Sequence, residues 1–346
     1  MKTTLFINAF AVLTPMFMAG LDVTSARAED AHQAQAMDDG GMVGTMSAAG
    51  YMPPGIMVGQ AGEWMLGYQA MFDHMSGNLT GTKSISNEKI LERFANTPTD
   101  MTMQMHMFMA MYAPSNDLTL MAMLPYIRKS MNHVSSAGVP FEERTGGIGD
   151  VELRGLYTLY ASPDLQHRVL LRGGVSLPTG SINKSMGGMR LEYPMQLGSG
   201  TVSLLPGLTY LGAKAPWNWG AEFGSNVRLG ENSNGYRLGN RHELSVRVAR
   251  QLTNWLTASI RADGEQWGNI HGADPLLDPT DEPTKDTNLQ GGKRLDLLLG
   301  ASLQPTGGFF KGQQFFIEAG APVYQSLNGP QLARSWVARG AWQWSF

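Results

Sequence analysis

The chain of 346 residues is rich in glycine and weakly charged, with 42 glycines, 16% charged residues and a formal net charge of −3. It contains no cysteine, which excludes disulfides, thiolate metal sites and cysteine nucleophiles. The near-neutral charge and the lack of a run of Lys or Arg argue against nucleic acid as a partner.

The first 28 residues have the layout of a secretory signal. Lys2 precedes an apolar stretch at 5–19, and a polar stretch then ends in Ala26-Arg27-Ala28. This order of basic, apolar and small-x-small segments predicts cleavage after Ala28 and export by a Gram-negative cell. The alternative is an N-terminal membrane anchor, but about 15 apolar residues are fewer than the ~20 that a helical span needs.

Residues 29–60 are rich in Gly, Ala, Met and Asp and have no periodicity, so we expect a flexible periplasmic leader. The leader carries one histidine and several methionines, whose soft sulfur suits Cu(I). These are His32, Met37, Met42, Met46, Met52 and Met57. Metal capture there is the less favoured alternative, and the sequence predicts no cofactor and no metal site.

Segments of about ten residues with period-two alternation begin at residue 61 and continue to the end of the chain. In 217–229, for example, Trp219 and Phe223 share an apolar face, while Glu222 and Arg228 share the polar one. No run of 18 apolar residues follows Ala28, which excludes a helical membrane protein. A soluble sandwich remains an alternative to a membrane barrel.

The connector lengths favour the barrel, because they alternate between short and long. Short ones are expected near 113–117, 161–166, 212–216, 253–254 and 305–312, and long ones near 74–100, 129–148, 179–199, 231–240, 268–292 and 325–332. The sequence therefore predicts an all-β fold: a transmembrane up-and-down antiparallel β-barrel at 61–346, of about twelve strands, with both termini periplasmic. Bulges or strand ends are expected at Pro125, Pro178 and Pro206.

The last segment, 336–346, alternates and ends on an aromatic residue, and it resembles the terminal recognition strand of outer-membrane proteins. That resemblance implies an assembly signal at Trp342, Trp344 and Phe346, read by the barrel assembly machinery. We expect this strand to close the barrel against 62–72. Trp217, Trp219 and Trp255 are expected to join Trp342 and Trp344 in an aromatic girdle, in contact with outer-membrane lipid and lipopolysaccharide.

The polar faces of the predicted strands are interleaved with charges of both signs. The predicted lumen residues are Asp150, Glu152, Arg154, Arg172, Glu222, Arg228, Glu243, Arg247, Arg261, Asp263, Glu265, Arg294, Asp296, Glu318 and Arg339. They fit either a network of ion pairs that fills a narrow lumen or the wall of a weakly selective pore.

Three further patterns in the sequence could serve a function. Methionines at alternate positions from Met101 to Met111 share one face, which we expect to meet lipid because the other face is more polar. His133-Val134-Ser135 matches a triplet of outer-membrane phospholipases, but no orienting Asn follows it, so no catalytic residue is predicted. Acidic residues in the 268–292 loop could bind Ca²⁺, although a plain solvated loop is expected. They are Asp274, Asp278, Asp281 and Glu282.

Several stretches resemble outer-membrane transporters grouped with the MetA pathway of phenol degradation. They are 61–65, 112–126, 174–181, 193–200, 322–325 and 329–332. The resemblance implies a barrel that passes small, often hydrophobic or aromatic, solutes and carries over no catalytic residue. We therefore expect a channel for passive or gated uptake of a small solute. The alternatives are a structural or adhesion barrel with a plugged lumen and a metal-linked protein that uses the leader.

Overall fold

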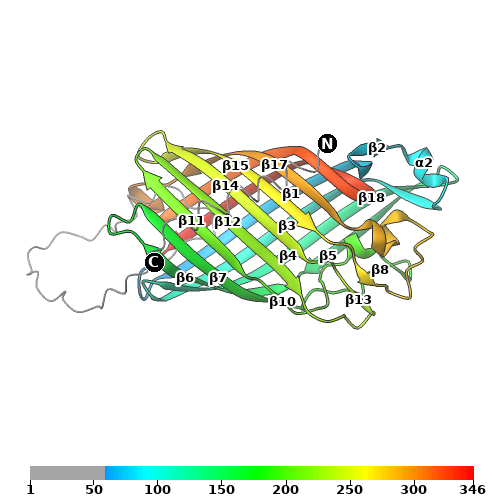
Figure 1. Cartoon of the computed structure of the whole chain (residues 1–346), viewed down its shortest axis with the longest axis horizontal. Helices are drawn as coiled ribbons and strands as arrows, with labels where there is room; N and C mark the ends of the chain where they lie inside the picture. The colour runs from blue at the N-terminus through cyan, green and yellow to red at the C-terminus, as the bar shows by residue number, and fades with distance from the viewer. Residues whose placement is uncertain (1–58) are drawn as a thin grey trace, which may run out of the picture. The chain divides into compact units, whose positions relative to one another are not determined.

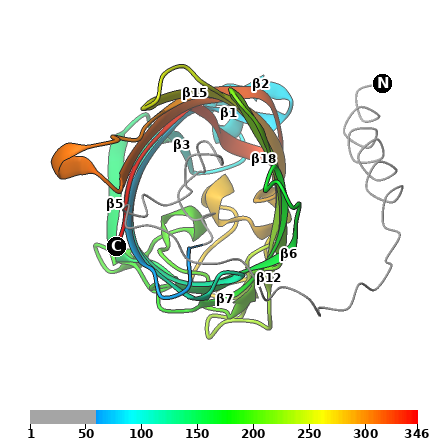
Figure 2. The ribbon, with the colours of Figure 1, turned by 90° about the vertical axis from the view of Figure 1, so that its left-hand side faces the viewer.

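The computed structural model describes residues 59–346, which form a closed antiparallel β-barrel (Figure 1). Seen along its axis, the strands make a continuous ring (Figure 2). The predicted cleavage site at Ala28 and the predicted leader up to residue 58 lie outside the described residues. Within the described part of the chain, no helix is long and apolar enough to cross a bilayer.

The wall strands are β1 (Trp64–Gly81), β3 (Asn96–Ser115), β4 (Leu118–Ser135), β6 (Val151–Ala161), β7 (His167–Leu177), β11 (Gly207–Lys214), β12 (Trp217–Arg228), β14 (Arg241–Gln251), β15 (Leu256–Trp267), β17 (Gly292–Leu303) and β18 (Gln313–Ser345). Smaller elements lie in the connections: β2 (Lys83–Ile85), α2 (Asn87–Leu91), β5 (Pro140–Ile148), β8 (Ser185–Met186), β9 (Met189–Arg190), η1 (Tyr193–Met195), β10 (Ser203–Leu204), β13 (Tyr236–Arg237), β16 (His271–Gly272), η2 (Pro283–Lys285), η3 (Thr287–Leu289) and η4 (Gly308–Phe310).

The wall strands pair in chain order, and β18 pairs with both β17 and β1. A straight strand of 33 residues would extend about 110 Å, so β18 must fold back on itself. Its residues 315–327 pair with β17, and its residues 331–345 pair with β1. Gln325 joins these two arms, because its side chain accepts from Arg334 N and donates to Arg334 O. When the two arms of β18 are counted separately, residues 59–346 contribute twelve antiparallel passes to the barrel wall, as the sequence predicted.

The barrel closes where the sequence predicted. The pairing runs from Met65 with Ser345 to His74 with Trp336. Trp64 N donates to Phe346 O over 3.0 Å, and Phe346 N donates to Trp64 O over 2.9 Å. Closure leaves no free strand edge at this seam, which a lipid environment requires.

One end of the barrel, here the turn end, carries the short connections, and the other, the loop end, carries the long ones. The exposed rings of Trp217, Trp255 and Trp344 lie at the turn end. The ring of Trp64 is also exposed, and it packs 4.7 Å from the ring of Tyr112. The predicted girdle position is therefore occupied by exposed tryptophans.

Three predicted connectors were too long. β1 continues to Gly81, β4 and β5 occupy most of 129–148, and β18 runs through 325–332. A membrane strand needs only about 9–11 residues, whereas β1 has 18 and β3 has 20. The extra residues lie beyond the apolar belt, where outward positions need not be apolar. The alternation that marks a strand in lipid therefore fades before the strand ends.

The three prolines lie at changes in the ladder. Pro178 follows the end of β7, and Pro206 separates β10 from β11, as predicted. Pro125 lies inside β4, at the point where the partner of β4 changes from β6 to β5. Its carbonyl accepts from Gly149 N over 2.9 Å, while its missing N–H costs no ladder bond at the switch.

Deleting Phe346 tests the closing pair. We expect a several-fold loss of folded barrel in the membrane fraction, because Trp64 loses both backbone bonds to the last residue. Heat-modifiable mobility on gels measures the folded fraction. Phe309→Ser, in the exposed 304–312 turn, is the control and should assemble normally; normal assembly of the Phe346 deletion would contradict this account of the seam.

Candidate functional site

The methionines of β3 face the barrel interior. Met111 pairs in register with Met121, and Met121 pairs with Arg154, which belongs to the polar face of β6. The ladder between β3 and β4 has no shift from Asp100 to Tyr112, so the alternate methionines keep this inward direction. Phe108 points the other way and is 52% exposed. The prediction of a lipid-facing methionine row was therefore wrong.

The inward methionines form an apolar arc over β1, β3 and β4, which we call the methionine arc. Near the turn end, Met65, Met111 and Met121 pack with Leu156, Leu170 and Leu211 in one buried cluster. Near the loop end, Met101 and Met131 pack with Leu191 and Met195. Met103, Met105 and Met107 lie between the two clusters and are only partly buried. The arc thus extends along most of the lumen.

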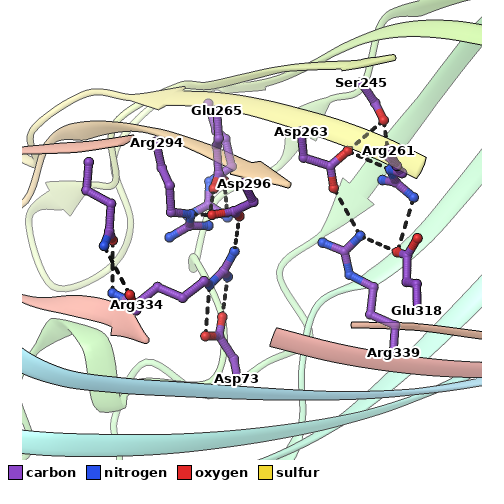
Figure 3. Close-up of polar contacts among 12 residues, drawn as sticks. Asp73, Ser245, Arg261, Asp263, Glu265, Arg294, Asp296, Glu318, Arg334 and Arg339 are labelled. Atoms are coloured by element: carbon purple, nitrogen blue, oxygen red, sulfur yellow. Dashed lines mark hydrogen bonds and ion pairs between the residues drawn. The ribbon is translucent and has the colours of Figure 1, made fainter. Parts of the chain in front are cut away.

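A second arc, on β14, β15, β17 and β18, carries paired charges, and we call it the charged arc (Figure 3). Arg261 Nε lies 2.5 Å from Asp263 Oδ1, and Arg261 Nη1 lies 3.4 Å from Glu318 Oε1. Arg339 Nη1 contacts the same two carboxylates over 3.1 and 2.8 Å. Ser245 Oγ donates to Asp263 Oδ1 over 2.6 Å. This square of two arginines and two acids ties β15 to both arms of β18.

A second group lies closer to the loop end and spans the closing seam (Figure 3). Arg334 on β18 binds Asp73 on β1 in a bidentate manner, and its Nη1 lies 2.6 Å from Asp296 Oδ2. Arg294 bridges Asp296 over 3.1 Å and Glu265 over 2.5 Å. The Asp73 side chain is fully buried, and that of Arg334 is 8% exposed. A chain of charge-assisted bonds therefore connects β15, β17, β18 and β1.

The remaining predicted lumen residues are placed as follows. Glu152 pairs with Arg154 over 2.7 Å, and Arg172 pairs with Glu222 over 3.3 Å. Glu243 lies directly opposite Glu265 in the ladder.

Arg228 donates to Gly239 O, and Arg247 is buried. Asp150 differs from the others, because its carboxylate accepts from Gly180 N and Ser199 N and so holds the 178–202 loop rather than another charge.

Asp73 and Arg334, which are central to the seam, were not among the predicted lumen residues. Asp73 fell one residue beyond the predicted first strand, and Arg334 lay between the last predicted connector and strand. Asp73 follows the inward alternation of Met71, so extending the first strand by one residue would have found it. Arg334 breaks the alternation of Arg339 and Val337, because the register shifts between His74 and Met75, and no period-two pattern would have found it.

The two arcs are neighbours at the seam, where β1 pairs with β18, but β3 and β4 of the methionine arc lie opposite β14 and β15 of the charged arc. β4 and β14 are separated by β6, β7, β11 and β12, whereas β3 and β15 are separated by β1, the two arms of β18 and β17. Four passes thus separate the pair β3–β4 from the pair β14–β15 in each direction around the ring. One side of the lumen is lined by thioethers and the opposite side by neutralised charge.

Two loops narrow the loop end. The green coil of η1 and the gold segment around η2 project inside the ring in Figure 2. Lys129 Nζ, on the inner face of β4, donates to Pro194 O over 2.7 Å and to Gln196 O over 2.6 Å. Tyr193 and Tyr236 pack edge to face, 4.9 Å apart, and burial raises the pKa of Tyr236 to about 12.

The sequence predicted a plain solvated loop at 268–292, and that prediction was wrong for most of its acidic residues. Asp274 and Glu282 are each 2% exposed, and Asp281 pairs with Lys285. Only Asp278 fits the expectation, since its carboxylate accepts from Thr280 in an exposed turn. The proline spacing predicted turns correctly but not that the loop folds inward over other polar groups.

Comparison with solved structures agrees with this architecture. An outer-membrane channel from Pseudomonas putida F1 superposes with a TM-score of 0.60 at 11% identity, covering 86% of this chain and 100% of the channel. The P. putida toluene transporter TodX gives 0.39 at 13% identity, over 83% of this chain and 91% of that one. The NalP translocator domain from Neisseria meningitidis gives 0.43 at 10% identity, over 82% and 88%. The sequence matches no protein-family model and no curated protein. At 11% identity, the likeness to the P. putida F1 channel concerns the fold alone, a barrel of the outer-membrane type.

Asp73→Asn tests the seam network. The change leaves Arg334 buried with one carboxylate partner fewer, and we expect a loss of about 3 kcal/mol in unfolding free energy, the low end for breaking a buried pair. Denaturant titration of the barrel in lipid vesicles measures it. Glu92→Gln, which removes an exposed pair with Lys89, is the control and should change little. Equal stability of the two variants would contradict the role given to Asp73.

Proposed function

We propose that this protein is an outer-membrane channel for passive or gated uptake of a small solute with an apolar, preferably aromatic, part and a polar part. The observation that carries the proposal is that the methionines of β3 and β4 lie across the lumen from the paired charges of β14 and β15. A lumen of this kind differs from that of a water-filled porin, which is polar all around. It offers two unlike surfaces to one solute.

The chemistry of each arc supports this solute class. Thioether sulfur makes favourable contacts with aromatic rings, and methionine side chains adapt to varied shapes. The arginines opposite them can bind a hydroxyl or carboxylate group, yet each is already paired with an acid, so binding stays weak enough for release. A phenol-like solute, with a ring and a hydroxyl group, matches both sides. The resemblance to transporters grouped with the MetA pathway agrees with this class.

Placement in the outer membrane follows from the same proposal. The predicted signal peptide would direct export, and the assembly machinery would read Trp342, Trp344 and Phe346 on the closing strand. The turn end, with both strand termini and the short connections, would face the periplasm. The loop end would face lipopolysaccharide and the medium. The 29–60 leader would precede the barrel on the periplasmic side.

A structural barrel with a plugged lumen is the competing function, and the inward loops favour it. The two functions differ in flux. Liposomes that contain the purified barrel should swell in a solution of arbutin, an aromatic glucoside. The same protein should conduct ions in planar bilayers. No swelling and no conductance would leave the plugged barrel as the better account.

The methionine arc can be tested within that assay. Met105→Gln and Met107→Gln should lower the ratio of arbutin to glucose uptake about two- to tenfold, since a sulfur–aromatic contact contributes roughly 0.3–1.5 kcal/mol. Phe108→Leu, on the outer face of the same strand, is the matched control and should leave the ratio unchanged. If all three variants keep the original ratio, the arc does not select the solute.

Arg261→Ala tests the charged arc. The variant leaves Asp263 and Glu318 with Arg339 as their shared cation and gives the lumen one extra negative charge. We expect a shift in reversal potential toward cation preference, measured in planar bilayers under a salt gradient, while assembly stays intact. Ser335→Ala, which removes an uncharged hydroxyl hydrogen-bonded to Ser76, provides the control. An unchanged reversal potential in Arg261→Ala would place Arg261 away from the ion path.

A further inference from the structure

Three acid and imidazole side chains meet inside the loop end of the barrel, although they lie far apart in sequence. His133 is on the inner face of β4, Glu192 precedes η1, and Glu282 precedes η2. Their ligand atoms all lie within 4.8 Å of one another. Two loops and one wall strand therefore bring one donor each to a common point.

The three side chains are buried and incompletely bonded. Their exposed fractions are 0% for His133 and Glu192 and 2% for Glu282. Among the described residues, no N–H or O–H donor reaches His133 Nε2, the carboxylate oxygens of Glu192 or Glu282 Oε2, and the group nearest to Glu192 is another acid, Glu143. Burying ionisable groups in this state is costly unless a ligand compensates. The free atoms point at each other, so one ligand could satisfy all of them.

The local charge is acidic. The carboxylate of Glu143 lies against that of Glu192, so three acids share this buried place with His133. Lys285 Nζ lies 3.1 Å from Glu282 Oε1. Lys285 also pairs with Asp281, and Lys129 on β4 is a second cation near Glu192, although its Nζ donates to Pro194 O and Gln196 O. A bound divalent cation would supply the missing positive charge.

The donor set and spacing fit a transition metal. His133 Nε2 lies 3.7 Å from Glu192 Oε1 and 3.3 Å from Glu282 Oε2. Ligands at about 2.0–2.1 Å in a tetrahedral Zn²⁺ site lie about 3.3–3.5 Å from one another. Imidazole nitrogen excludes the all-oxygen shells typical of Mg²⁺ and Ca²⁺. Phe141 stacks on the His133 ring, 4.9 Å away and 6° from parallel, and so fixes its plane.

We propose that His133, Glu192 and Glu282 form a binding site for a divalent transition metal such as Zn²⁺, with Glu143 as the nearest further carboxylate. Lys285 would then bind Glu282 Oε1 and so orient the carboxylate with Oε2 toward the metal. The metal would fasten the two inward loops to β4. That this fastening regulates passage rests on the proposed channel function, whereas the site itself does not.

Titration calorimetry of the metal-free mature barrel with Zn²⁺ tests the site. We expect one Zn²⁺ per chain, with affinity reduced at least tenfold in Glu192→Gln and in Glu282→Gln. Glu88→Gln, an exposed acid in α2 at the same end, is the control and should bind as the unaltered protein does. Heat-modifiable gel mobility verifies that each variant is folded. Absence of binding, or binding that these two changes leave intact, would overturn the proposal.

A second measurement uses the unaltered protein and so does not depend on a variant that folds. Co²⁺ should give a visible absorption spectrum of a four- or five-coordinate site with nitrogen and oxygen donors, displaced by Zn²⁺, and Zn²⁺ should raise the Tm of the barrel. A spectrum of free aqueous Co²⁺ and an unchanged Tm would show that the cluster holds only a shared proton. Liposome flux is measured separately, so a silent channel with a bound metal would count against the proposed function alone.

Discussion

The structure depends on one constraint: the ring of strands must be closed by backbone hydrogen bonds between β1 and β18, such as those that join Trp64 to Phe346. In lipid, a strand edge cannot be left unpaired, so β18 must return to β1. Once the ring is closed, every wall residue points either to lipid or to the lumen, and a shift by one residue would exchange the two faces. The positions of the methionines and the arginines are therefore consequences of register.

The seam shows how register and charge support each other. Arg334 reaches Asp73 across the closing pair and Asp296 across the other arm of β18. A buried ion pair of this kind contributes little net free energy over an apolar pair, but removing one partner is costly. We interpret the network as a determinant of specificity: the correct register satisfies each charge, whereas a slipped register would place Asp73 in lipid.

Much of the barrel could be predicted from the sequence, since period-two alternation, connector lengths and the aromatic terminus all follow from lipid contact. The inner surface was harder to predict. The polar residues Thr102, Gln104 and His106 suggested a lumen face on β3, but part of that strand extends beyond the apolar belt, where outward polar residues carry no penalty. The inward methionines were misassigned because a lumen may be apolar. Only the pairing of Met111 with Met121, and of Met121 with Arg154, decides the face.

The inward folding of the long loops could not be predicted, because it depends on contacts between segments 59 to 149 residues apart, counted from His133 to Glu192 and to Glu282. No local pattern signals that a buried histidine will meet two acids from separate loops. Folding these loops inward places ionisable groups where water does not reach them, at a cost that the tyrosine and methionine clusters alone would have to offset. A ligand shared by the three side chains would turn that cost into a fastening. The same donors that destabilise a free plug would then stabilise a bound one.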